Sequence, residues 1–270
     1  MFQISEFLSS VCVVDTETTG LDPTTAEIVE MACAHYVSGN WSVESQLFNT
    51  SNGIPPEASA KNQISRRMLL GQPLFDSEAL PQIIDMLGMP KYFVAHNVNY
   101  DQKVLSSSFE RMGEHTLAVM FQDPNSWICT WRLSKHIYQH SFTDKIYNQN
   151  YLRYKLDLPV PDSIGVHRAG ADVQVCGALL ERIVEDSISG NFVDPTQPIG
   201  AQLVELSRAP IIYATWPLGK YRGQTLNSIP TDYFLWAIEN QGSLRETDPG
   251  YDFDLAESVR QELETRLSAS

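Results

Sequence analysis

Four acidic residues stand at the edges of apolar segments. Asp15 and Glu17 lie one residue apart in the stretch VVDTETTG, where a short apolar run ends. Asp101 lies in VAHNVNYDQKVL, and Asp172 lies in HRAGADVQVCGALL, five positions after His167. Residues two apart on an extended chain point to the same side, so Asp15 and Glu17 are expected to face one site.

Converging carboxylates are hard oxygen ligands suited to Mg²⁺ or Mn²⁺. Two such cations can activate a water on one side of a phosphodiester and stabilise the leaving oxygen on the other. Acids this close would repel one another strongly without the cations. His167 has an imidazole whose ordinary pKa of about 6.5 suits it to take a proton from the attacking water. Together these residues predict a two-metal site that hydrolyses phosphodiesters.

Each of these residues also has a purely structural explanation. The Asp15–Glu17 pair could be a polar strand end that turns into solvent. Asp101 could be a first-turn helix residue favoured by the helix dipole, and Asp172 could be an N-cap. A single histidine such as His167 is more often a surface or core residue than a base. Only the joint pattern favours catalysis.

The segments that would position these residues alternate between strand and helix patterns. Apolar β-branched runs predict strands, and apolar residues at i, i+3, i+4 and i+7 predict amphipathic helices. Gly39 and Asn40 are expected to form a hairpin turn. The order predicts an α/β fold, a mixed sheet with helices packed on it. The predicted strands are 11–14, 27–37, 41–48 and 91–96, and the predicted helices are 80–87, 99–109 and 171–185.

A change in composition after Asp186 indicates a second unit. The stretch SISGNFVDPTQPIG is rich in Gly, Pro, Ser and Asn, which is typical of a linker. Beyond it, Thr231 is expected to cap an aromatic helix over 231–240, and a final α-helix carries apolar residues every fourth position. We therefore predict a catalytic domain over 1–186, a linker region over 187–210 and a small α-rich C-terminal domain over 211–270.

The bulk composition narrows the function classes. Hydrophobic residues make up 43% of the 270 residues, which is enough for a substantial core, and the formal net charge of −14 argues against coating nucleic acid by bulk attraction. The four cysteines are scattered without zinc-ligand spacing, so reduced core thiols are expected. The chain has no apolar stretch approaching ~20 residues and no basic segment before an apolar N-terminal run. A cytoplasmic protein with no membrane partner is expected.

Three of these stretches, in this order, resemble the exonuclease motifs of the DEDD superfamily: VVDTETTGL, VAHNVNYDQKVL and HRAGADVQVC. The H-x-x-x-x-D spacing resembles its histidine-bearing subclass, DEDDh. The resemblance implies a ribonuclease H-like fold and removal of nucleotides from 3′ ends with two divalent cations, Mg²⁺ or Mn²⁺. It also implies four metal ligands and a general base, namely Asp15, Glu17, Asp101 and Asp172 with His167.

The segment WPLGKYRGQTLNSIPTDYFLWAIEN resembles the C-terminal extension of exodeoxyribonuclease X-type members of that superfamily. With it, the resemblance covers nearly the whole chain. One departure is Asn62, which stands where many relatives carry a histidine. That substitution puts in doubt a substrate contact at this position and leaves the metal ligands unaffected.

The resemblance also implies substrate contacts beside the acids. The turn after the first motif would lie against the terminal nucleotide, with Leu21 packing on its base and Thr18 contacting its sugar through the backbone. Leu21 could instead anchor the turn in the core. His96 and Asn97 could position the scissile phosphate or fix the turn before Asp101, and a structural role is favoured for His96.

The C-terminal motif GKYRG is basic and aromatic within an acidic protein. Lys220 and Arg222 could grip phosphates, and Tyr221 could stack on a base. The motif could equally be a tight turn with a core tyrosine and two solvated cations. The aromatic residues of the helix that follows are expected to form the core of the small unit.

These observations predict a metal-dependent 3′-to-5′ exodeoxyribonuclease whose partner is the 3′ end of single-stranded or frayed duplex DNA. A 3′-to-5′ exoribonuclease is a second possibility, because the chemistry does not distinguish the sugars and recognition of a 2′-OH would decide. A proofreading or partner-binding subunit is a third, although the intact acids and histidine weigh against an inactive site.

Overall fold

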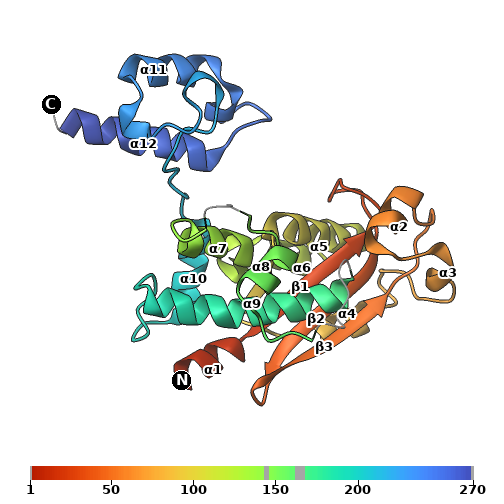
Figure 1. Cartoon of the computed structure of the whole chain (residues 1–270). Helices are drawn as coiled ribbons and strands as arrows, with labels where there is room; N and C mark the ends of the chain where they lie inside the picture. The colour runs from red at the N-terminus through yellow and green to blue at the C-terminus, as the bar shows by residue number, and fades with distance from the viewer. Residues whose placement is uncertain (1, 143–145, 162–167, 269–270) are drawn as a thin grey trace. The chain divides into compact units, whose positions relative to one another are not determined.

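The computed structural model describes residues 2–142, 146–161 and 168–268. Its centre is a five-stranded sheet in the order β3-β2-β1-β4-β5. Figure 1 labels β1, β2 and β3 of this sheet. The strands are β1 (Val11–Thr18), β2 (Ile28–Val37), β3 (Asn40–Leu47), β4 (Tyr92–Ala95) and β5 (Trp127–Cys129). The predicted mixed sheet with flanking helices is confirmed.

The sheet joins an antiparallel meander to two parallel strands. β1 pairs antiparallel with β2, and β2 pairs antiparallel with β3, while β4 and β5 run parallel to β1. The turn between β2 and β3 uses Ser38 and Gly39, both with positive φ, so the predicted Gly39–Asn40 turn lies one residue earlier. Consequently the carboxyl ends of β1 and β4 meet the amino end of β2 at one edge of the sheet.

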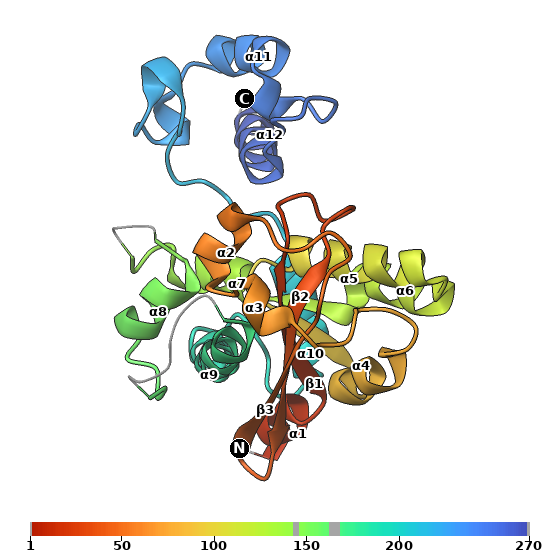
Figure 2. The ribbon, with the colours of Figure 1, turned by 90° about the vertical axis from the view of Figure 1, so that its right-hand side faces the viewer.

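Helices cover both faces of the sheet, as Figure 2 shows. α9 (Ala169–Ser189) packs across β1, β2 and β3 on one face. α4 (Leu80–Leu87), α5 (Val98–Met112) and α6 (His115–Gln122) cover the other. Alternate residues of β1 divide between the two cores, because side chains alternate across a strand. Val11 and Val13 pack in the core beneath α9, and Cys12 and Val14 pack in the core beneath α4, α5 and α6.

Further helices belong to the first unit. They are α1 (Phe2–Leu8), α2 (Pro56–Asn62), α3 (Arg66–Leu69), α7 (Thr130–Tyr138), α8 (Gln149–Lys155) and α10 (Ile199–Arg208). In the described ranges, no helix is long and apolar enough to cross a membrane. The four cysteines are buried free thiols, as expected from their spacing.

Close contact with β3 fixes the position of α9. Gly177 faces the Trp41 ring, and a Cβ built on this glycine would lie 2.7 Å from two carbon atoms of that ring. The Trp41 indole Nε1 donates a hydrogen bond of 2.6 Å to Glu181 Oε1. The small residue therefore permits an approach that a larger side chain would prevent.

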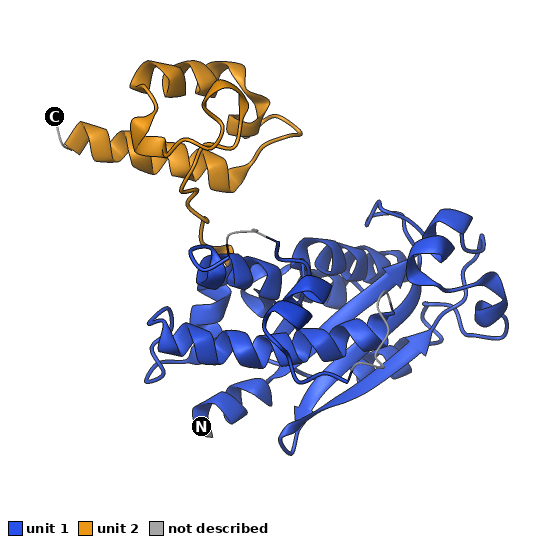
Figure 3. Cartoon of the chain, viewed as in Figure 1, with its two compact units in different colours: residues 1–207 blue, residues 208–270 orange. Residues whose placement is uncertain are grey.

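The chain divides into two compact units, residues 1–207 and 208–270 (Figure 3). The segment predicted as a linker contains α10, whose Leu203 and Val204 belong to the core of the first unit. The second unit contains α11 (Thr231–Asn240), α12 (Phe253–Ser268) and the short 3₁₀ turns η2 (Gly219–Tyr221), η3 (Leu226–Ser228) and η4 (Gly242–Leu244). Thr231 is not the N-cap of α11, because Pro230 holds that position.

Candidate active site

Three of the predicted acids converge at the sheet edge. Asp15 and Glu17 project from the end of β1, and Asp172 projects from the first turn of α9. One carboxylate oxygen from each lies within 4.8 Å of the others. The sheet and the docked helix therefore bring together residues that are 157 positions apart (172 − 15).

Burial and mutual repulsion disfavour charge on these acids. The pKa of Asp15 is raised well above its ordinary value by burial and by the charges of Asp101, Asp172 and Glu17. Burial and the charge of Asp172 raise the pKa of Glu17 to about 7. A divalent cation among these oxygens would offset that repulsion, and an all-carboxylate donor set fits Mg²⁺ or Mn²⁺.

Asp101 lies beside this group and is not one of its three members. Its Oδ1 accepts hydrogen bonds from the Thr16 amide at 3.0 Å and the Thr16 hydroxyl at 2.8 Å. The Asp101 side chain is buried, and burial raises its pKa to about 7 despite these hydrogen bonds. The first turn of α5 thus holds a carboxyl close enough to raise the pKa of Asp15, and its role as a metal ligand stays a prediction.

The predicted general base, His167, lies outside the described residues. The chain is described again from Arg168, immediately before α9. The role of His167 therefore stays a prediction from its spacing to Asp172.

A buried ion pair anchors the start of α9, and sequence reasoning missed it. Glu30 is 2% exposed and stands opposite Glu17 in the β1–β2 ladder. Its Oε2 and Oε1 accept hydrogen bonds of 2.9 Å from Nε and Nη2 of Arg168. Such bidentate charge-assisted pairs are strong and directional. The pair joins β2 to the residue that precedes α9.

Two further donors complete the environment of Glu30. The Ala169 amide donates to Oε2 at 3.2 Å, and the Ser45 hydroxyl donates to Oε1 at 2.8 Å. The first amide of α9 is therefore held by the same carboxylate. Because Asp172 lies one turn further along α9, Glu30 positions that carboxylate without belonging to the group. A glutamate within the otherwise apolar strand sequence IVEMACA was the available signal, since buried charges need partners.

The turn after β1 presents an apolar side chain to solvent. Leu21 is 82% exposed, so the alternative that it anchors the turn in the core is wrong. Thr18 is buried, and its hydroxyl donates to Gly20 O at 2.9 Å and lies 2.5 Å from the Tyr100 hydroxyl. The Tyr100 hydroxyl also donates to Gly20 O at 2.5 Å. These bonds fix the turn that carries Leu21, and Tyr100 was not anticipated from the sequence.

Protein groups occupy both ring nitrogens of His96. Nε2 lies 2.9 Å from Tyr147 O, and Nδ1 lies 3.0 Å from the Thr130 hydroxyl. Burial lowers the pKa of His96 to about 4, so the ring is neutral at pH 7. A carbonyl only accepts, so Nε2 carries the proton and Nδ1 accepts from Thr130. These contacts give His96 a structural role. The next residue, Asn97, is exposed with φ of 79° at the start of α5.

Residues from α2 border the turn after β1. Asn62 is buried, accepts from the Ile64 amide at 3.0 Å and donates a long bond of 3.4 Å to Thr18 O. The asparagine that departs from the family pattern is thus tied to the backbone of this turn. Its neighbour Lys61 is exposed, and its charge acts to lower the pKa of Glu17.

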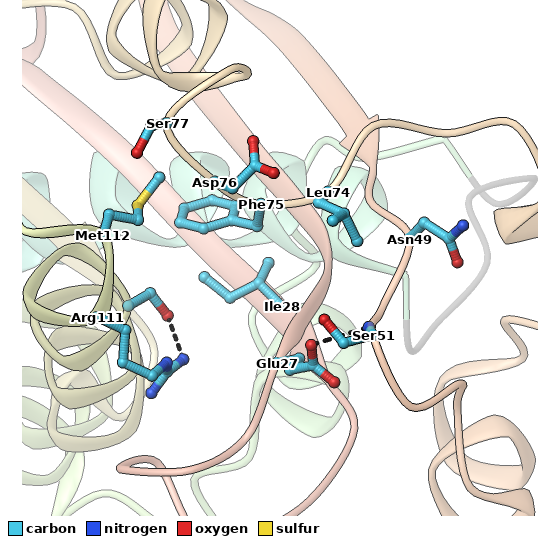
Figure 4. Close-up of a pocket in the computed structure, with 11 residues that line it drawn as sticks. Glu27, Ile28, Asn49, Ser51, Leu74, Phe75, Asp76, Ser77, Arg111 and Met112 are labelled. Carbon is cyan, nitrogen blue, oxygen red and sulfur yellow. Dashed lines mark hydrogen bonds between the residues drawn. The ribbon is translucent and has the colours of Figure 1, made fainter.

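A separate pocket of about 260 Å³ lies between β2, the loops after β3 and before α4, and the end of α5 (Figure 4). Its arginine, Arg111, donates to Thr24 O at 2.6 Å and to Ala26 O at 2.9 Å. The Arg111 guanidinium is therefore already hydrogen-bonded to backbone carbonyl oxygens, and the acids Glu27 and Asp76 also line the pocket. The pocket therefore offers little to a phosphate and contains none of the predicted site residues.

Comparison with known proteins agrees with this geometry. The exonuclease family model RNase_T matches residues 12–180. The chain therefore belongs to the exonuclease family. The predicted membership of the DEDD superfamily and the predicted enzyme class, a nuclease that hydrolyses phosphodiesters, are confirmed.

Individual relatives extend the likeness beyond the matched domain. Exodeoxyribonuclease 10 of Escherichia coli is 26% identical over 237 residues, which cover 86% of this chain and 92% of that protein. The 3'-5' exonuclease DinG of Staphylococcus haemolyticus is 30% identical over 174 residues, 64% of this chain and 18% of that protein. The structure of Exonuclease X in complex with 5′ overhanging duplex DNA is similar in fold, with a TM-score of 0.51 and 24% identity over 71% of this chain and 99% of that one.

Proposed function

We propose that this exonuclease is a metal-dependent 3′-to-5′ exodeoxyribonuclease that removes nucleotides from DNA 3′ ends. The observation that carries the proposal is the group formed by Asp15, Glu17 and Asp172, with Asp101 beside it. The similarity to the 3'-5' exonuclease of Staphylococcus haemolyticus supports the direction, and the similarity to the exodeoxyribonuclease of Escherichia coli supports the sugar.

The four carboxylates would hold two divalent cations, Mg²⁺ or Mn²⁺. When bound, such cations supply Lewis acidity toward the phosphate and the attacking and leaving oxygens. Glu30 and Arg168 keep Asp172 in register with the β1 acids, and Thr16 orients Asp101. His167 would accept the proton of the attacking water.

The turn after β1 would receive the terminal nucleotide. The exposed Leu21 side chain offers an apolar surface to a base, and the turn is fixed by the Thr18 and Tyr100 hydroxyls. Asn97, exposed at the start of α5, would lie near the scissile phosphate. A base that packs on Leu21 has to be unpaired, so single-stranded or frayed 3′ ends are the proposed substrates.

End-labelled substrates test this proposal. Single-stranded DNA, duplex DNA and RNA, each labelled at one end, are incubated with the protein in Mg²⁺ or in chelator. A 5′ label should give a ladder of progressively shorter DNA, and a 3′ label should give mononucleotide at once. RNA degradation at a rate equal to that of DNA would overturn the sugar assignment. A ladder from 3′-labelled DNA would overturn the direction.

A further inference from the structure

The second unit carries an exposed tryptophan beside two tyrosines, Tyr221 and Tyr233, that are partly exposed and pack against its core. Trp236 on α11 is 49% exposed, whereas its neighbour Phe234 is buried. The ring centroids of Trp236 and Tyr233 lie 5.4 Å apart, and those of Tyr233 and Tyr221 lie 4.5 Å apart. We call these three rings the aromatic row. The expectation that the aromatic residues of this helix form the core holds for Phe234 and is wrong for Trp236.

Two cations flank the aromatic row on η2 and the residue after it. Lys220 Nζ lies 5.2 Å from the centroid of the Tyr221 ring, and both Lys220 and Arg222 are exposed. Arg222 Nε donates to Pro217 O at 2.9 Å, which fixes the direction of the guanidinium. The GKYRG motif thus places two charges and one ring of the row in three consecutive residues.

The pairing of charges elsewhere in this unit sets these two cations apart. Arg245 pairs with Asp248, Arg266 pairs with Glu262, and Arg260 pairs with two glutamates. Among the described residues, neither Lys220 nor Arg222 has a carboxylate within ion-pair distance. Two cations without a carboxylate partner, beside the partly exposed Tyr221 ring, are conspicuous in a protein of net charge −14.

We propose that the second unit binds single-stranded DNA on this surface. Bases would stack on the aromatic row, and Lys220 and Arg222 would contact phosphates. Taking the strand to be DNA rests on the proposed function; the stacking and charge argument does not. Stacking tolerates every base, which suits an enzyme that shortens strands of any sequence. Asp232 is exposed one turn before Trp236, so affinity is expected to come mainly from stacking.

A binding experiment on the full chain tests the proposal. All variants carry Asp15→Asn so that the DNA stays intact, and the probe is fluorescent oligo-dT of about 20 nucleotides, longer than a single binding patch. Trp236→Ala should weaken binding about tenfold, and Trp236→Phe should restore most of it. The matched control is Leu235→Ala, because Leu235 is 52% exposed on the same helix but carries no ring. Its affinity should stay within about twofold.

Salt dependence reports separately on the two cations. Replacing Lys220 and Arg222 together by alanine should weaken binding and flatten the slope of log K against log salt by about 1.4, the loss of two single-strand phosphate contacts. Replacing the paired Arg245 by alanine should leave that slope unchanged. Unchanged affinity in both Trp236→Ala and the double variant would overturn the proposal, as would equal losses in Trp236→Ala and Leu235→Ala.

A minimal substrate separates this proposal from the proposed function. The p-nitrophenyl ester of thymidine 5′-phosphate is a single nucleotide without a strand to stack on the aromatic row, so its hydrolysis reports on the acids. Proteins with an intact Asp15 should hydrolyse it equally with and without Trp236→Ala. No hydrolysis by either would count against the proposed function alone. Slower hydrolysis caused by Trp236→Ala would place Trp236 at the catalytic site and overturn the proposal of a separate DNA-binding surface.

Discussion

Glu30→Gln should damage catalysis without touching a predicted metal ligand. In the native protein Glu30 receives four hydrogen bonds: two from Arg168, one from the Ala169 amide and one from the Ser45 hydroxyl. Glutamine keeps the shape of the side chain but accepts fewer hydrogen bonds, because its NH₂ group is a donor and would face the donors that now bind Glu30. Breaking one partner of a buried pair costs about 3–5 kcal/mol. Arg168 is 36% exposed and can recover some solvation, so we expect about 2 kcal/mol.

The consequence for activity follows from the position of α9. A loosened first turn misplaces Asp172 relative to Asp15 and Glu17, and a shift of about 1 Å can cost about 10²-fold in rate. We expect kcat to fall by about 10²-fold and the Mg²⁺ concentration for half-maximal rate to rise. Glu30→Asp, which keeps the charge on a shorter side chain, should recover part of the loss.

The assay is nucleotide release from single-stranded DNA across a Mg²⁺ titration, with urea unfolding of each variant. The matched control is Asp85→Asn, because Asp85 is exposed on α4 across the sheet. A purely structural role would lower stability and leave the Mg²⁺ dependence of the surviving folded enzyme as in the wild type. That result would refute Glu30 as a positioning residue.

Three further predictions follow from the site and the packing. The pKa of Glu17 is raised from 4.5 to about 7, so between these pH values the folded metal-free protein holds a proton that the unfolded chain has released. The free energy of unfolding of the metal-free protein should therefore fall as pH rises from about 4.5 to 7. Mg²⁺ should restore that free energy by an amount that grows over the same range. Thermal unfolding at pH 5 and 8 with and without Mg²⁺ measures this, and equal Mg²⁺ stabilisation at both values would contradict it. Gly177→Ala should lower the free energy of unfolding in urea by about 1–3 kcal/mol, because its Cβ would meet the Trp41 ring. The control is Gly250→Ala, whose Cβ would meet open space and should leave that free energy unchanged. Equal stabilities of the two variants would refute the packing argument. Leu21→Ala should leave stability within about 0.5 kcal/mol and raise KM for single-stranded DNA several-fold, and an unchanged KM would remove Leu21 from the substrate site.

The sequence predicted β1 to β4 and the long helices because their patterns are strong and local, whereas the three-residue strand β5 was missed. The apolar run before Asp15 and the 3.6-residue period over 171–185 each indicate their element without tertiary information. Short helices such as α7 and α8 were missed, because a segment of one or two turns takes its stability from tertiary packing more than from propensity. The helical part of the predicted linker, α10, was missed because its flanking Gly and Pro residues dominate the composition.

For the candidate site, the sequence revealed the residues that carry charge and a motif. It did not reveal the residues that hold them, such as Glu30, Thr16 and Tyr100. Those contacts join positions 80 or more apart in the chain, and no local pattern encodes them. The exposure of Trp236 was equally beyond pattern reasoning, because an apolar residue in a helix is taken as core until the packing around it is known. For Leu21 the family resemblance had left both an exposed and a core position open.

The rate of nucleotide release from 3′-labelled single-stranded DNA in Mg²⁺, compared between Asp15→Asn and Asp85→Asn, tests the central claim most directly. Asparagine keeps the size of the side chain and removes the charge from the acidic group. Removing this charge should cost several kcal/mol of transition-state stabilisation, so Asp15→Asn should release nucleotides about 10²-fold or more slowly than the wild type. Asp85→Asn should release them at the wild-type rate. Equal rates in the two variants would contradict a metal site built on Asp15, Glu17 and Asp172.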